Sequence, residues 1–141
     1  MLQCCVAEDP RRAEAAARAV VLRFLRHPSA VLLFAEHATV AELEEMQRGL
    51  AAGDTEGAAQ AVPQSVVDAF VIYGDPATCR RQLADYRCAG IDLPVVFPMP
   101  VAGSWDGVPE ATIAAFASAS SEPGELVAPG GGGGERRAEV G

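Results

Sequence analysis

The chain has 141 residues, a length typical of one domain that buries roughly two-thirds of its unfolded surface. Its formal net charge is -8 and none of its basic residues is Lys, so it lacks the basic clusters that bind phosphate backbones, and nucleic acid is excluded as a partner. The first residues carry no basic segment, and their apolar run is too short for a signal or a membrane span, so we expect a cytoplasmic protein without membrane association.

The chain begins with a short apolar segment, Leu2–Ala7, that the composition favours as a β-strand. It leads into Asp9-Pro10, an N-cap residue followed by proline at the first helical position. Alanine, valine, phenylalanine and leucine residues then repeat at helical spacing as far as Leu25, and we expect Pro28 to close this helix.

The region 29–61 has helical spacing but no strand pattern. Thr39 and Glu42 form a capping box, in which each side chain satisfies a backbone donor of the other residue. The helix that follows has an apolar stripe and ends near Gly53-Asp54, and a weaker helical turn occupies residues 56–61. We therefore expect a helical excursion between two strands.

The segment 62–100 is the most strongly patterned part of the chain. Its spacing predicts a helix from Pro63 to Gly74, followed by a second helix that Asp75-Pro76 opens and Gly90 ends. The run Ile91–Phe97 is apolar at nearly every position, which predicts a strand buried on both faces. Because a long helical connection separates it from the first strand, we expect the two strands to lie side by side and parallel.

The C-terminal part changes composition abruptly. A last helix starts near Pro109, and from Ser120 onward the sequence is dominated by Ser, Glu, Pro and Gly. Such a segment cannot bury enough apolar surface to offset its ordering entropy. We therefore divide the chain into one domain, residues 1–119, and a disordered tail, residues 120–141.

Neither the cysteines nor the histidines form a recognisable catalytic or metal motif. Cys4 and Cys5 are adjacent and point to opposite faces of a strand, whereas Cys79 and Cys88 lie nine apart on opposite sides of a helix. The two histidines lack the spacing and the further ligands that zinc needs. We therefore predict reduced thiols, no metal site and no catalytic residue.

Gly103-Ser104 is the one candidate for cofactor binding. It follows the predicted strand at residues 91–97 and precedes a helix, a position where free backbone N–H groups favour an anion such as a phosphate. A plain polar loop is the alternative interpretation, because two residues without a fuller glycine motif are a weak signal.

An ordered set of segments resembles the C-terminal part of the luciferase-like oxidoreductases, which include bacterial luciferase-like monooxygenases and deazaflavin-dependent reductases. The matching segments are CVAEDPRRAEAAAR, VPQSVVDAF and YGDPATCRRQLADYRCAGIDLPVV, and the resemblance covers about residues 2–102. It implies an α/β fold, specifically part of a (βα)8 TIM barrel, and a flavin (FMN) or coenzyme F420 as the cofactor of the parent family.

The resemblance also implies that much of the barrel is missing. Family members are more than twice this length, and the chain corresponds to their last two strands with a helical insertion. We therefore expect a truncated gene, a mis-called start or one half of a split protein that binds no cofactor and is inactive alone. Another barrel fragment or self-association would supply the missing strands. The alternative is a non-catalytic interaction module that pairs its exposed strands with another chain.

Overall fold

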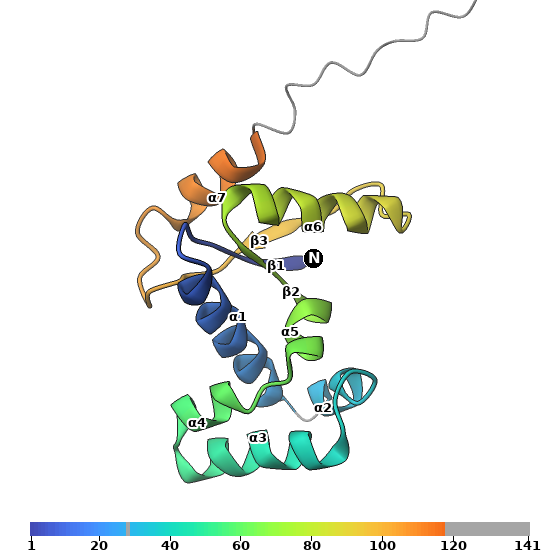
Figure 1. The fold of residues 1–141 in the computed structure, drawn as a ribbon, viewed down its shortest axis with the longest axis vertical. Helices are drawn as coiled ribbons and strands as arrows, with labels where there is room; N and C mark the ends of the chain where they lie inside the picture. Colours follow the sequence, from blue (N-terminus) through green and yellow to red (C-terminus); the bar gives the residue numbers. More distant parts are fainter. Residues whose placement is uncertain (28, 118–141) are drawn as a thin grey trace, which may run out of the picture.

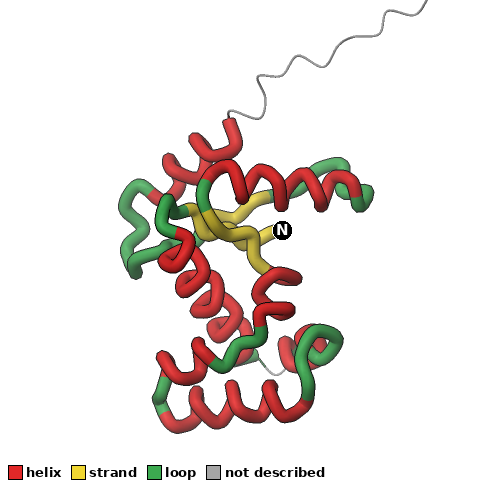
Figure 2. The backbone as a smooth tube through the Cα atoms, viewed as in Figure 1, coloured by secondary structure: helices red, strands yellow, loops and turns green. Residues whose placement is uncertain are grey.

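The computed structural model describes residues 1–27 and 29–117, which form a small parallel sheet with helices on both faces (Figures 1 and 2). The strands are β1 (Leu2–Val6), β2 (Val71–Gly74) and β3 (Val96–Pro98), in the spatial order β2-β1-β3. Both neighbours of β1 run parallel to it, with Gln3 opposite Val71 on one side and Phe97 on the other. The predicted parallel pairing of the first and last strands is therefore confirmed.

The first helix, α1 (Pro10–Leu25), begins where the sequence predicts. Asp9 is its N-cap, and one carboxylate oxygen accepts a hydrogen bond of 3.0 Å from the backbone N–H of Arg11. The apolar face of α1 packs on the sheet beside Cys5, so the main hydrophobic core lies between this helix, the helices that follow it and one face of the strands. Pro28, the predicted end of this helix, lies outside the described residues.

The helical excursion consists of α2 (Ala30–Phe34), α3 (Val40–Ala52) and α4 (Thr55–Gln60), without a strand, as predicted. The capping box is present at the start of α3, where Thr39 and Glu42 satisfy each other's backbone donors. Gly53 ends α3 in the left-handed conformation, with φ of 77°. These helices lie at the far end of α1 from the sheet (Figure 1).

The prediction of one helix from Pro63 to Gly74 is wrong at its C-terminal end. The chain forms α5 (Gln64–Phe70) and then switches to β2, which pairs with β1. Val71, Ile72 and Tyr73 are β-branched or aromatic residues that suit a strand, and a run this short fits the end of a helix equally well. The prediction of two strands is corrected to three.

The next helix, α6 (Pro76–Cys88), is capped by Asp75 as predicted, whereas the following strand differs from its prediction. Only Val96–Pro98 pairs, as β3, and the strand is not buried on both faces: Leu93 is 83% exposed, Val95 55% and Phe97 41%. The physical reason is that β3 is an edge strand, and only the end of α1 approaches this face, where Arg23, Phe24 and Phe97 line one pocket.

The helices cover the sheet from two sides. Cys5 belongs to the core beneath α1, whereas Cys4, Ile72 and Cys79 form a second core beneath α6. In a (βα)8 barrel consecutive strands are neighbours and all the helices lie outside. Here β1 lies between β2 and β3 with helices on both faces, so the connections from β1 to β2 and from β2 to β3 run in opposite directions across the sheet. The chain is an α/β protein, and its place within a barrel stays a prediction.

The last described element, α7 (Val108–Ala117), packs against α6 and the sheet. It contains the helix predicted near Pro109. The predicted disordered tail, residues 120–141, lies outside the described residues. Within residues 1–27 and 29–117 no helix has the length and apolar character needed to cross a membrane.

Candidate functional site

The carboxyl ends of the strands are where α/β proteins place their ligands, and the predicted residues Gly103 and Ser104 lie near this edge. A pocket of about 230 Å³ separates the ends of β1 and β3 from the start of α7, and Ser104 lines it together with Val6 and Met99. Gly103 has φ of 76°, a conformation that favours glycine. The sequence therefore places this loop correctly between strand and helix.

The side chain of Ser104 is engaged within its own loop. Its Oγ donates to the Asp106 carboxylate at 2.9 Å and accepts from the backbone N–H of Asp106 at 3.1 Å. Asp106 is the one charged residue that lines this pocket, and Glu110 adds a second carboxylate in the first turn of α7. A phosphate placed here would meet negative charge, so the described residues do not fit an anionic cofactor unaided. Cofactor binding by Gly103 and Ser104 stays a prediction.

The placement of the cysteines on opposite faces confirms the geometric prediction. Cys4 and Cys5 point to opposite faces of β1, and Cys79 is buried whereas Cys88 is exposed. All four thiols are free. A hydrogen bond with Cys79, together with burial, raises the pKa of Cys4, and burial raises the pKa of Cys5 to about 12. No group of metal-ligating side chains assembles within the part of the chain that the structure describes.

A polar cluster that the sequence prediction missed connects α1, α5 and β2. The hydroxyl of Tyr73 donates to Asp68 at 2.7 Å, and Gln64 donates to the same carboxylate oxygen at 2.8 Å. Arg18 donates to Gln64 at 2.7 Å and forms an ion pair with Glu14 at 2.8 Å. The spacing of Glu14 and Arg18, four residues apart on one helix, was the available signal.

The chemistry of this polar cluster indicates a structural role. Burial and the neighbouring Asp68 raise the pKa of Tyr73 to about 12, so its hydroxyl remains a neutral donor. Arg18 also donates to the backbone carbonyl of Val62, which fixes the chain just before α5. The polar side chains of the cluster hydrogen-bond to one another, and the cluster positions β2 against α1.

These features define an α/β protein with a parallel sheet. Residues 1–93 match the model of the luciferase-like monooxygenase family, and the chain belongs to this family. Among solved structures, the coenzyme F420-dependent tetrahydromethanopterin reductase from Methanopyrus kandleri is similar, with a TM-score of 0.54 and 23% identity over 64% of this chain. The chain covers 26% of that reductase. A search of curated protein sequences finds no match.

Proposed function

We propose that the chain supplies one part of a luciferase-like oxidoreductase or monooxygenase whose cofactor site is completed by further strands, from the same polypeptide or from another. The observation that supports this is the small sheet: three strands offer three carboxyl ends, whereas a barrel cofactor is held by groups that converge from many strand ends. The family membership gives the reaction class. A cytoplasmic location is part of the same proposal.

The cofactor in this proposal is coenzyme F420 or a flavin, which would carry the hydride or oxygen chemistry while the protein supplies position and a dry pocket. The reductase that resembles this chain depends on coenzyme F420. In this proposal the chain alone does not bind either cofactor, which the carboxylates Asp106 and Glu110 beside the loop at Gly103 and Ser104 support. We therefore assign no catalytic step to any residue of this chain.

Titration of the purified chain with FMN and with coenzyme F420, followed by fluorescence, tests the proposal. We expect no saturable binding in the micromolar range and no turnover, because even millimolar affinity requires about 4 kcal/mol after association entropy is overcome. Saturable micromolar binding would contradict the proposal. Its loss in Ser104→Ala would then assign the site to the loop at residues 103–104.

A non-catalytic interaction module is the second candidate function. It is favoured by β3 and the segment before it, where apolar side chains that alternate along the chain are exposed, namely Ile91, Leu93, Val95 and Phe97. A partner would cover these side chains. Sedimentation of the wild-type chain and of Leu93→Ser/Phe97→Ser, with and without a candidate partner, separates this function from the first.

A further inference from the structure

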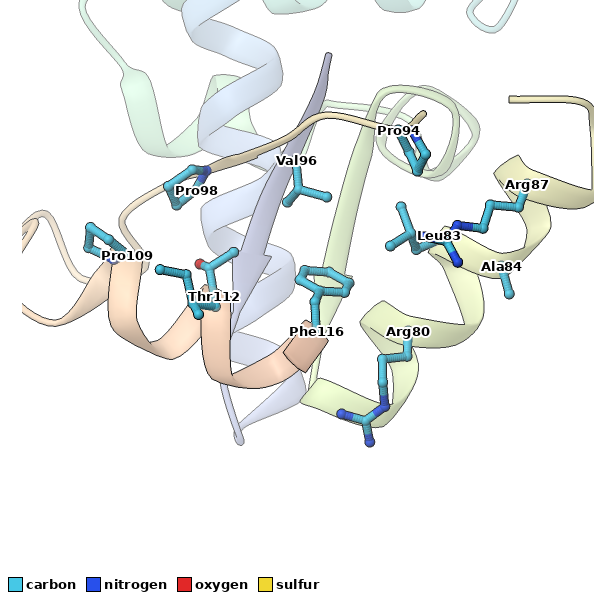
Figure 3. Close-up of a pocket in the computed structure, with 11 residues that line it drawn as sticks. Arg80, Leu83, Ala84, Arg87, Pro94, Val96, Pro98, Pro109, Thr112 and Phe116 are labelled. Atoms are coloured by element: carbon cyan, nitrogen blue, oxygen red, sulfur yellow. The ribbon is translucent and has the colours of Figure 1, made fainter. Parts of the chain in front are cut away.

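A pocket of about 560 Å³ lies between α6, β3 and α7, on the face of the sheet away from α1 (Figure 3). Its walls are formed mainly by apolar side chains from all three elements, and Figure 3 shows Leu83, Val96 and Phe116 directed into the space between them. This volume lies within the range of roughly 300–1,000 Å³ that is usual for small-molecule sites. The pocket is separate from the loop at residues 103–104 that borders the carboxyl ends of the strands.

The charged groups of this pocket are both positive. Arg80 and Arg87 lie on the α6 wall, on either side of Leu83 and Ala84, and are separated by two helical turns or about 10 Å (Figure 3). None of the lining residues is acidic. Among the described residues the one ion pair joins Glu14 and Arg18, so no described carboxylate pairs with either pocket arginine. Two cations and no carboxylate therefore line this pocket.

The two arginines differ in their other contacts. Arg80 is partly buried, and its Nη1 donates to the backbone carbonyl of Ala115 at 2.7 Å, which fixes the guanidinium between α6 and α7. Arg87 is exposed, and its guanidinium donates no hydrogen bond to another described residue. Either guanidinium, the fixed one of Arg80 or the free one of Arg87, can bind a carboxylate through paired N–H donors.

The remaining lining favours an alkyl chain over a peptide. The Thr112 hydroxyl already donates to the backbone carbonyl of Val108 at 2.9 Å, so it cannot also donate to a ligand. Val95 and Met99 use their backbone groups to pair with β1. Backbone groups alternate in direction along a strand, so those of residues 94, 96 and 98 point away from β1, toward the open edge of the sheet. Two of these three are prolines, which lack the N–H that an added strand requires.

We propose that the pocket between α6, β3 and α7 binds an anionic amphiphile, specifically a single-chain alkyl carboxylate, with the carboxylate at Arg80 or Arg87 and the chain against Leu83, Val96 and Phe116. Ile113, which lines the pocket and is 69% exposed, would be covered by the bound chain. Binding of this kind uses no cofactor and is independent of the proposed oxidoreductase role.

Calorimetric titration of the full chain with decanoate, in submicellar solution, tests the proposal, with decanol and acetate as the neutral and chain-free probes. We expect saturable decanoate binding. Decanol, which lacks the charge-assisted contacts, and acetate, which lacks the apolar contacts, should each bind at least about tenfold more weakly. Equal affinity for decanoate and decanol would overturn the proposal.

Two matched variants change the exposed residue Ala84 on α6. Ala84→Glu places a carboxylate one helical turn from both Arg80 and Arg87, where it pairs with them and repels the ligand, whereas Ala84→Gln adds similar bulk without charge. We expect about tenfold weaker decanoate binding in Ala84→Glu and less than threefold change in Ala84→Gln. Arg87→Gln should weaken binding and Arg48→Gln, on α3, should not. Unchanged affinity in Ala84→Glu would overturn the proposal. Decanoate binding that appears only after residues 118–141 are removed would also overturn it, because the C-terminal segment would then be the occupant of the pocket.

Discussion

The side-chain amide of Gln82 on α6 pairs with both backbone polar groups of Tyr73 on β2. The Tyr73 N–H donates to Gln82 Oε1 at 3.0 Å, and Gln82 Nε2 donates to the Tyr73 carbonyl at 3.1 Å. The amide therefore occupies the edge of β2 as a neighbouring strand would, on the side away from β1. Prolines at positions 94 and 98 remove two backbone N–H donors at the other edge of the sheet.

Gln82→Met tests this capping. The variant keeps the length of the side chain but leaves the two Tyr73 groups without partners, so the free energy of unfolding should fall by about 1–3 kcal/mol. The freed edge should also make the chain self-associate with increasing concentration. Urea denaturation and sedimentation measure the two effects. Gln47→Met, at an exposed position on α3, is the control, and equal behaviour of the two variants would contradict the role of Gln82.

The tail is predicted to be dispensable for folding. Residues 120–141 are rich in glycine and polar residues, with few apolar side chains that could anchor them. Removal of this segment should change the free energy of unfolding by less than about 0.5 kcal/mol, the range of unimportant surface changes. Thermal denaturation of the shortened chain is the measurement. A clear fall in Tm on truncation would mean that the tail docks on the domain.

Local signals in the sequence predicted the helix starts well. Asp9, Thr39 with Glu42, and Asp75 all cap helices as expected, because a cap depends on residues within one helical turn. The strand β2 was missed, since Val71–Gly74 extends the apolar spacing of α5 and only pairing with β1 decides its conformation. The exposure of Phe97 was missed for a similar reason: it depends on which helix covers β3.

The candidate sites were predictable to different degrees. The position of Gly103 and Ser104 between strand and helix follows from chain order, but the contact of Ser104 with Asp106 is a property of the folded loop. The pocket between α6, β3 and α7 combines segments 80–87, 94–98 and 109–116, which have no joint pattern in sequence. Its one local signal is the spacing of Arg80 and Arg87 on the same helix face.

The thiols should divide into one reactive and three protected groups. Cys88 is exposed, whereas Cys4, Cys5 and Cys79 have no exposed surface. Thiol reagents attack the thiolate, and burial keeps the pKa of Cys5 near 12. We expect one fast-reacting thiol per folded chain and four after denaturation. Cys88→Ser should leave no fast thiol, and two or more fast thiols in the wild-type chain would contradict the buried placement of the others.

The capping box gives a pH dependence with a defined sign. Hydrogen bonds from the backbone N–H and hydroxyl of Thr39, each 2.7 Å long, hold the pKa of Glu42 below its ordinary value of 4.5. The folded state therefore binds this proton less readily than the unfolded state, so the carboxylate stabilises the fold above pH 4.5. That stabilisation is lost as the pH falls from 4.5 through the lower folded-state pKa.

Urea denaturation between pH 6 and pH 3, in steps of about half a unit, measures this contribution. In Glu42→Gln the amide oxygen can still accept from Thr39 but does not titrate, so the free energy of unfolding should fall less steeply below pH 4.5 than in the wild-type chain. Some slope should remain, because a hydrogen bond from the backbone N–H of Thr78 lowers the pKa of Asp75 in the same way. Glu45→Gln, an exposed position on the same helix, should keep the wild-type slope. Identical slopes in Glu42→Gln and the wild-type chain would show that the Thr39–Glu42 contact does not favour the carboxylate in solution.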